Sequence, residues 1–186
     1  MLDTTTYLPQ LKIFEGVSSW MYVDTTGNVT VGVGNLLANA EAAQQLAFVL
    51  RGNPGAGQAA ADDIQQDFDN VKEQLPGRLV SFYKDFTRLD LPDSVIDSLL
   101  NSRVVEFTTG IRAAFPDYDS YPDEACAAIF DMAFNLGLGK LTSEFPHFCR
   151  AVKATDWATA AMQCKRNGIG ASRNDWTQAQ FQAAAS

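Results

Sequence analysis

Residues 20–34 constrain the fold more than any other stretch of this 186-residue chain. On the outward run, Trp20, Tyr22 and Asp24 alternate with Met21 and Val23. On the returning run, Val29, Val31 and Val33 alternate with Thr30, Gly32 and Gly34. Because a period of two is typical of a β-strand, the stretch predicts a hairpin that closes around Gly27.

The length of the hairpin loop determines which side chains share a face. A three-residue loop over 26–28 predicts three opposite pairs: Asp24 with Thr30, Tyr22 with Gly32, and Trp20 with Gly34. That face would carry a carboxylate, a hydroxyl, two aromatic rings and two glycines over which a ligand could approach closely. A two-residue loop would instead place Asp24 and Thr30 on opposite faces.

The remainder of the chain has helical spacing. A helix is expected over Thr4–Glu15, where Gly16 would end it. Further helices are expected around 41–50, 62–75, from Pro92 through Val104, 126–134, 145–152, 157–164 and 174–184. Asp62 or Asp63 is expected to cap the second of these, and Gly110 is expected to interrupt the chain after the third.

Composition excludes several classes of partner. A hydrophobic content of 46% is enough for a substantial core in one domain or two small lobes. The formal net charge of −8 argues against nucleic acid, or an anionic membrane surface, as a partner. The sequence shows no apolar run that could span a membrane and no secretion signal, so no stable membrane insertion is expected.

The cysteines and the histidine do not form a recognisable metal or redox motif. Cys126, Cys149 and Cys164 lie far apart on apolar stripes, so we expect buried free thiols. A disulfide stays open if the protein works in an oxidising compartment. His147 is the only histidine and is expected at the surface, which predicts a protein without a metal or other cofactor.

Two carboxylates stand in contrasting surroundings. Glu15 ends the first helix beside Ile13 and Phe14, where the helix dipole and apolar neighbours disfavour ionisation, as a general acid needs. Asp24 lies among threonines in the hairpin and is expected to stay ionised, as a base needs. Such a pair is typical of glycoside hydrolysis.

The spacing of these residues is also that of a known family. Glu15-Gly16, then Asp24, then Thr30, followed by Gly-Val-Gly-Asn-Leu-Leu over 32–37, resembles the phage-type lysozymes, the endolysin muramidases of the T-even phage kind. The resemblance resumes at 133–137 (Ala-Phe-Asn-Leu-Gly) and again at 171–174 (Ala-Ser-Arg-Asn). Residues 38–125 do not match closely.

The resemblance implies a mainly α (α+β) fold with two lobes and a cleft between them. The small N-terminal lobe with the hairpin would span about 12–60, a connecting helix about 61–75, and a helical C-terminal lobe, packed with the N-terminal helix, about 78–186. The implied reaction is hydrolysis, with inversion, of the β-1,4 bond between N-acetylmuramic acid and N-acetylglucosamine in peptidoglycan. Glu15 would be the general acid, and Asp24 with Thr30 would position the water.

Six further residues are candidates for substrate binding. The resemblance places Leu36 and Phe134 on cleft-lining positions, and Arg173 on a position that pairs with the catalytic glutamate. Asn35 stands where the family often has histidine, and either side chain can donate a hydrogen bond. Tyr22 could stack on a sugar or pack over Gly32, and Phe134 lies on an apolar stripe that also suits core packing.

Several settings and alternatives stay open. A monomeric muramidase would reach the cell wall, in the periplasm or outside the cell, as an endolysin after lysis or as a secreted antibacterial effector with an immunity protein as inhibitor. A catalytically inactive glycan-binding or structural module is the main alternative. A metal-dependent amidase or a cysteine peptidase fits poorly, because the chain has one histidine.

Overall fold

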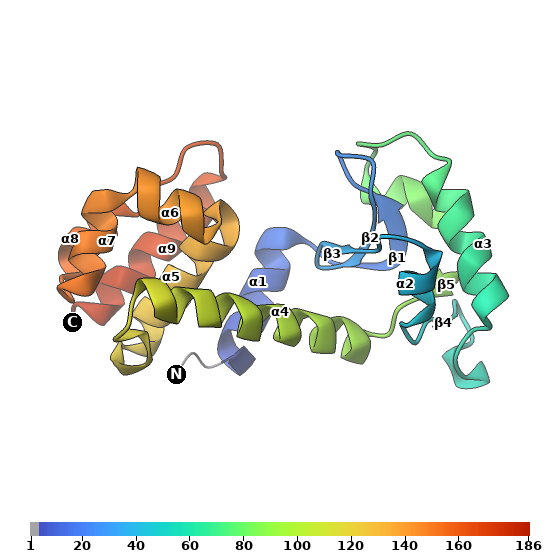
Figure 1. Cartoon of the computed structure of the whole chain (residues 1–186), viewed down its shortest axis with the longest axis horizontal. Helices are drawn as coiled ribbons and strands as arrows, with labels where there is room; N and C mark the ends of the chain where they lie inside the picture. Colours follow the sequence, from blue (N-terminus) through green and yellow to red (C-terminus); the bar gives the residue numbers. More distant parts are fainter. Residues whose placement is uncertain (1–3) are drawn as a thin grey trace. The chain divides into compact units, whose positions relative to one another are not determined.

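The computed structural model describes residues 4–186 and is mainly helical, with a small three-stranded antiparallel sheet. Figure 1 shows the order of the elements. The chain forms two compact units, which we describe separately. The hairpin unit is Glu15–Asn101, and the helical unit comprises the described residues up to Phe14 together with Ser102–Ser186.

The elements follow one another along the chain in a simple order. Those that begin before residue 101 are α1 (Thr4–Glu15), β1 (Ser18–Val23), β2 (Val29–Gly32), β3 (Asn35–Leu36), α2 (Ala40–Gln44), β4 (Val49–Leu50), η1 (Pro54–Ala56), α3 (Ala61–Lys72), η2 (Val80–Phe86), β5 (Leu89–Asp90) and α4 (Asp93–Ala114). The others are η3 (Tyr118–Ser120), α5 (Asp123–Leu136), α6 (Leu138–Glu144), α7 (Pro146–Lys153), α8 (Trp157–Gln163) and α9 (Ala171–Ala184).

Helix α1 has the predicted bounds, and the prediction that Gly16 ends it is confirmed. Gly16 has φ +75°, a left-handed conformation that glycine adopts without a steric penalty. Tyr7 and Leu11 are buried, and the ring of Tyr7 packs edge-on against Phe130 at 5.1 Å. The stripe that predicted the helix is therefore the face that packs into the helical unit.

The hairpin is present, but its predicted register is wrong. Tyr22 lies opposite Thr30 and Val23 opposite Val29, while Ser18 lies opposite Gly32 because the pairing shifts between Ser18 and Tyr22. Asp24 donates its backbone amide to the carbonyl of Asn28 at 2.9 Å, so the three-residue loop is 25–27 rather than 26–28. A shift of this kind moves pairs along the strands without exchanging the faces.

A predicted helix around 41–50 is replaced by two shorter elements. Helix α2 ends at Gln44, and β4 pairs with β5, with Val49 opposite Asp90 and Leu50 opposite Leu89. The helix begins where Asn39 accepts a hydrogen bond from the amide of Ala42 at 2.8 Å. The apolar run that follows α2 thus contributes to a small second sheet.

Helix α3 lies wholly inside the hairpin unit and does not connect the two units. The residue before the first turn is Ala60, which provides no side-chain cap. Asp62 and Asp63, one of which was expected to cap the helix, both lie in its first turn. The predicted stripe holds for Ile64, Phe68 and Val71, which are buried, whereas Leu75 is exposed beyond the end of the helix.

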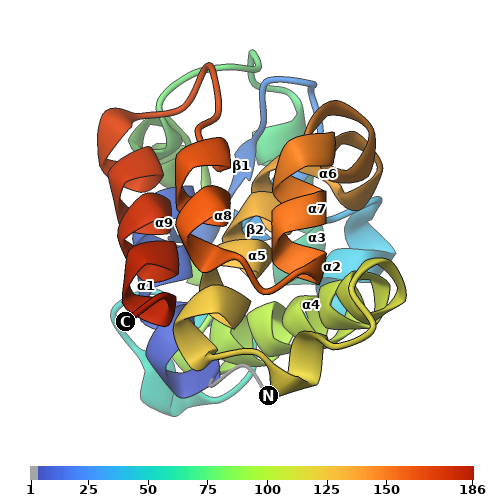
Figure 2. The same ribbon diagram turned by 90° about the vertical axis from the view of Figure 1, so that its left-hand side faces the viewer.

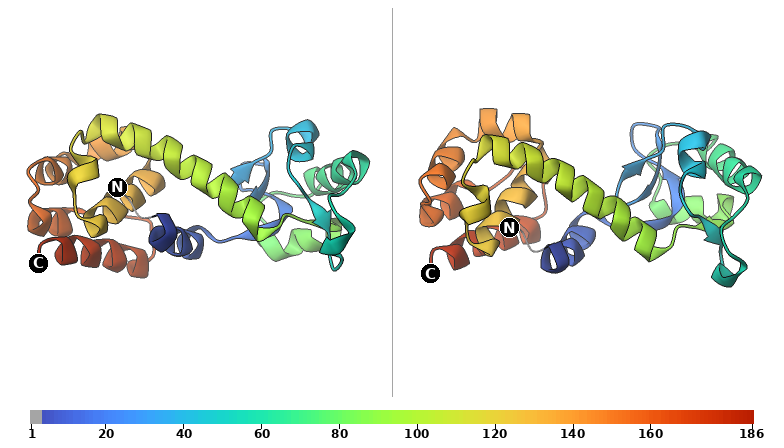
Figure 3. Two further views of the ribbon diagram at one scale, coloured as in Figure 1. Left: turned by 90° about the horizontal axis from the view of Figure 1, so that it is seen from below. Right: turned by 60° about the horizontal axis from the view of Figure 1, so that its bottom comes forward.

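The boundary between the units falls inside α4, and Gly110 does not interrupt that helix. Figure 3 shows α4 as one continuous helix. A Cβ added at Gly110 would collide with the side chain of Leu138, so glycine permits a close approach of α6. The packing against Leu138 explains why a residue of low helix propensity is accommodated there.

The helical unit is built around α5. Residues 125–133 of α5 are all buried, and Figure 2 shows α8 lying between α7 and α9. Helix α5 ends at Gly137, which has φ +78°, as the sequence predicted, but α6 was not predicted. Its seven residues contain only one buried side chain, Leu141, and so show no periodic stripe.

The cysteines form no disulfide among themselves. Cys126, Cys149 and Cys164 are free, and burial raises the pKa of the Cys126 thiol to about 11. Among residues 4–186, no helix combines the length and the apolar character needed to cross a membrane.

Candidate active site

Glu15 is the last residue of α1 and the first residue of the hairpin unit. Its side chain is exposed, and its neighbour Ile13 is 73% exposed, so Ile13 does not shield the carboxyl group from water. Phe14, by contrast, packs edge-on against Trp176 with a ring separation of 5.4 Å. The end of the helix is therefore held by the aromatic residue that precedes Glu15.

Asp24 organises the hairpin loop. Its Oδ1 accepts hydrogen bonds from the backbone amide of Thr26 at 2.8 Å, the hydroxyl of Thr26 at 2.8 Å and the amide of Asn28 at 2.9 Å. Oδ2 accepts none of these three bonds. Carboxylates that accept backbone hydrogen bonds in turns stabilise the turn and hold a fixed rotamer.

The same hydrogen bonds lower the pKa of Asp24. Loss of contact with water raises its pKa, but the bonds from Asn28 and Thr26 together outweigh this effect. The pKa therefore lies below the ordinary value of 3.8. Asp24 is ionised at neutral pH, as the sequence predicted and as its ordinary pKa already requires, and the hydrogen bonds, which favour the charged form, extend ionisation to lower pH.

Thr30 is connected to Asp24 through the backbone of Asn28. The Thr30 hydroxyl donates to the carbonyl of Asn28 at 3.3 Å, and the amide of Asn28 donates to Asp24. Thr30 is buried, lies opposite Tyr22 on β1 and pairs with Leu36 on β3. Asp24 and Thr30 thus share one end of the hairpin, although they are not directly opposite each other.

Gly32 does not leave an open surface for a ligand, which corrects the expectation from sequence. It has φ +67°, and a Cβ added there would lie 3.5 Å from a side-chain carbon of Ile96 at the start of α4. Gly32 is therefore needed for its backbone conformation and is covered by Ile96. The ring of Tyr22 lies 6.5 Å from that of Tyr83.

The other candidates in the hairpin unit lie on the short third strand. Leu36 is exposed and Asn35, which pairs with Val31, is half-buried. The seven candidates within Glu15–Asn101 are Glu15, Tyr22, Asp24, Thr30, Gly32, Asn35 and Leu36. Phe134 and Arg173 belong to the helical unit.

Phe134 is part of an aromatic cluster, so packing accounts for much of its surface. Its ring stacks on Phe130 at 5.7 Å and lies 5.1 Å from Phe107. The guanidinium of Arg103 lies 5.0 Å from the centre of the Phe134 ring, a distance at which cation–π attraction is effective. The surroundings of Phe134 thus include two aromatic rings and one cation.

Arg173 binds Asp131, a partner that the sequence analysis missed. Its Nε donates to Oδ1 of Asp131 at 2.9 Å, and its guanidinium lies 5.0 Å from the ring centre of Phe14. Arg166, also missed, donates to Oδ2 of Asp131 at 2.6 Å, and Thr177 donates to the same oxygen at 2.8 Å. The signal for this cluster was one carboxylate inside the otherwise apolar run 125–134.

A pocket of about 540 Å³ in the helical unit lies beside Arg173. Its lining includes the apolar residues Ile13, Phe14, Ile169 and Trp176 together with Arg173. Ile13 and Phe14 place this pocket beside the last turn of α1.

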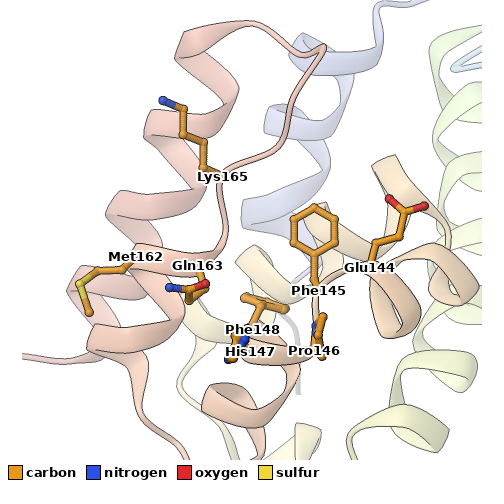
Figure 4. A pocket seen from close by; sticks show the side chains of 8 residues that line it. All are labelled: Glu144, Phe145, Pro146, His147, Phe148, Met162, Gln163 and Lys165. Carbon is orange, nitrogen blue, oxygen red and sulfur yellow. The ribbon is translucent and has the colours of Figure 1, made fainter.

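A smaller pocket lies elsewhere in the helical unit and contains none of the predicted site residues. Figure 4 shows its lining, which includes Phe145, His147 and Met162, and its volume is about 240 Å³. His147 is exposed, as expected. Among residues 4–186, no group of three or more His, Cys, Asp or Glu side chains is placed to hold a metal ion.

A scan against models of protein families and a search of curated proteins found no match to this chain.

Proposed function

We propose that this protein is a muramidase with the fold of the phage-type lysozymes. It would hydrolyse the β-1,4 bond between N-acetylmuramic acid and N-acetylglucosamine. The observation that carries the proposal is the arrangement of Asp24 and Thr30, which are joined through the peptide groups of Asn28 at one end of the hairpin. The lowered pKa of Asp24 keeps it in the unprotonated form that a proton acceptor needs, although it also makes the carboxylate a weaker base.

Each proposed role follows from the chemistry of the group. Glu15 would protonate the glycosidic oxygen as the bond breaks. Oδ2 of Asp24 would accept a proton from the attacking water, because the three loop hydrogen bonds all end on Oδ1. The Thr30 hydroxyl donates to Asn28, so its lone pairs can accept a hydrogen bond from the same water.

Attack by a water molecule held opposite the leaving group gives inversion at the anomeric carbon. Substrate contacts within the hairpin unit are assigned to Tyr22, Asn35 and Leu36, and no cofactor is required. We propose that the enzyme acts as a monomer on glycan strands of the cell wall, as an endolysin or as a secreted effector. A specific protein inhibitor that co-purifies with the chain would favour the second setting.

The principal test compares carboxylate variants on purified peptidoglycan. The wild type should release reducing ends of muramic acid, identified by mass, and Glu15→Gln should lower the rate about 100-fold or more. Glu106→Gln is the matched control, since Glu106 is also an exposed glutamate on a helix. Wild-type activity in Glu15→Gln would refute the proposal, because an amide cannot donate the proton that the leaving oxygen needs.

A second candidate is a glycan-binding or structural module without activity. It is favoured by one observation, that the hydrogen bonds of Asp24 are also those of a carboxylate that only stabilises a loop. Binding of muropeptides by the wild type without release of reducing ends would support this candidate.

A further inference from the structure

A lysine at the end of α3 contacts the hairpin loop beside the proposed base. Lys72 lies in the last turn of α3, and its ammonium donates a 2.8 Å hydrogen bond to the backbone carbonyl of Gly27. The two residues are 45 positions apart in the chain, and both belong to the hairpin unit. The contact therefore joins the tip of the hairpin to a helix outside it.

The carbonyl that Lys72 contacts belongs to the same peptide group as the amide of Asn28. That amide donates to Oδ1 of Asp24 at 2.9 Å. In a trans peptide group, the C=O and N–H bonds lie in one plane and point in opposite directions. A contact that fixes the Gly27 carbonyl thus also fixes the amide from which Asp24 accepts.

Gly27 makes such a restraint useful, because it allows the backbone to rotate at this point. It has φ +87°, and a Cβ added there would meet no atom within 4 Å. Glycine adopts several backbone conformations at similar free energy. Rotation of the peptide group that follows Gly27 would break the bond from Lys72 and the bond to Asp24 together.

The two hydrogen bonds of this peptide group also strengthen each other. A cation at the peptide oxygen polarises the group, so that its N–H becomes a better donor to a carboxylate. The chain of contacts runs from the ammonium of Lys72, through the peptide group, to Oδ1 of Asp24. The carboxylate is thus held at Oδ1, on the side away from the oxygen assigned to the attacking water.

The end of α3 is itself held in place. Val71, which precedes Lys72, is completely buried, and α3 packs against β1 and β2. The loop after α3 is closed by the hydroxyl of Tyr83, which donates to the carbonyl of Leu75 at 2.8 Å and accepts from the amide of Arg78 at 3.3 Å. The backbone on both sides of Lys72 is therefore fixed, and the lysine can hold the hairpin loop against it.

Nearer partners are available to Lys72. A lysine in the last turn of a helix can interact with the free carbonyl groups of that helix, and Asp69 and Glu73 lie close to it in the sequence. Among residues 4–186, however, Lys72 forms no ion pair with a carboxylate. Its bond to a different element points to a role in the hairpin loop.

We propose that Lys72 is a positioning residue for Asp24, acting through the peptide group between Gly27 and Asn28. This role rests on the proposed muramidase function, in which Asp24 is the base. Lys72 does not touch the reacting atoms. It keeps the carboxylate in the orientation from which Oδ2 takes up the proton of the attacking water, and such orientation contributes to the rate of the chemical step.

The first test measures hydrolysis of purified peptidoglycan. Lys72→Met keeps an unbranched side chain but removes the donor, so kcat should fall about fivefold while KM stays almost unchanged. Lys72→Arg keeps a cationic donor and should restore most of the rate. Lys153→Met is the matched control, since Lys153 is also an exposed lysine in the last turn of a helix, α7. Equal rates in the two methionine variants, or a higher KM at unchanged kcat, would overturn the positioning role.

The second test does not require activity. Carbon NMR of the Asp24 carboxyl group in Lys72→Met should show a pKa that rises toward 3.8, because the amide of Asn28 becomes a weaker donor. The amide proton of Asn28 should move upfield for the same reason. An unchanged carboxyl pKa together with an unchanged amide shift would overturn the positioning role, even if the wild type is active. A wild type that does not hydrolyse peptidoglycan would instead refute the muramidase proposal, and the titration would still show whether Lys72 acts on Asp24.

Discussion

Asp24 accepts a 2.9 Å hydrogen bond from the backbone amide of Asn28, four residues further along the chain. This bond closes the hairpin loop on the side chain that is also the proposed catalytic base. Asp24 therefore has a structural role as a hydrogen-bond acceptor in the loop and a proposed chemical role as a base. The two roles can be tested separately, because the first needs an oxygen that accepts a hydrogen bond and the second needs a group that takes up a proton.

Asp24→Asn separates the two roles. Asparagine keeps an oxygen that can accept from the amides of Thr26 and Asn28, but it cannot take a proton from water. We expect the hydrolytic rate to fall about 100-fold or more while the hairpin stays folded. Thr26→Val is the control, because it removes the two loop hydrogen bonds of the Thr26 hydroxyl, to Asp24 and from the Asn28 side chain, and leaves the carboxylate. A rate that falls equally in both variants would assign Asp24 to loop structure alone.

The pH dependence should follow the low pKa of Asp24. A carboxylate whose pKa is lower in the folded state contributes stability above its unfolded value, here 3.8, and loses it as pH falls through the folded value. Protonation of Asp24 should therefore lower neither the stability of the hairpin nor the activity at pH values above 3.8. Carbon NMR of the Asp24 carboxyl group measures this, and a midpoint above 3.8 would contradict it.

Asp131→Ala should strongly destabilise the protein. It would leave Arg166, which is completely buried, and Arg173 without the carboxylate that both contact. Removal of one partner from a buried ion pair costs about 3–5 kcal/mol, and urea denaturation would measure it. Asp119→Ala removes an exposed carboxylate from Arg112 and should leave the urea midpoint almost unchanged. Equal effects of the two changes would contradict the prediction.

Asp67 offers a test of how β5 is attached to α3. Its Oδ2 accepts from the amides of Arg88 at 2.8 Å and Leu89 at 2.9 Å, and burial raises its pKa. Asp67→Ala should lower the free energy of unfolding by about 2–3 kcal/mol, because two buried amides lose their acceptor.

Asp67→Asn is the matched variant, because it keeps an acceptor for both amides and removes only the charge. Its loss of stability should be clearly smaller. A raised pKa means that the charged form is disfavoured in the folded state, so the stability contributed by the carboxyl group is present below pH 3.8 and lost as pH rises through the folded pKa. Equal losses in both variants would assign the main contribution to the charge of Asp67 beside Arg88.

The sequence predicted the elements whose side chains repeat with a clear period. Helix α1, the hairpin and α5 all have such a stripe, and glycines with positive φ mark the ends of both helices. The register of the hairpin could not be predicted, because it depends on an irregularity between Ser18 and Tyr22 and on the hydrogen bonds of Asp24. Neither leaves a signal in the alternation of side chains.

Elements that depend on distant partners were the ones missed. Val49 and Leu50 form a strand because residues 89–90 pair with them, and a short apolar run does not reveal such a partner. Gly110 lies inside α4, where the side chain of Leu138 occupies the space that a Cβ would need. Arg166 is a charged residue near a turn in the sequence, and only the tertiary structure brings it to Asp131.

The hydroxyl of Tyr83 has a consequence for how this chain can vary. A phenylalanine would fill the same buried space, yet it would supply neither the bond to Leu75 nor the acceptor for Arg78. The phenolic oxygen of Tyr83 therefore holds the loop after α3 closed through two hydrogen bonds, whereas a phenylalanine ring would only fill the buried space. Relatives with tyrosine at this position should retain the shape of the loop even where the exposed residues around it differ.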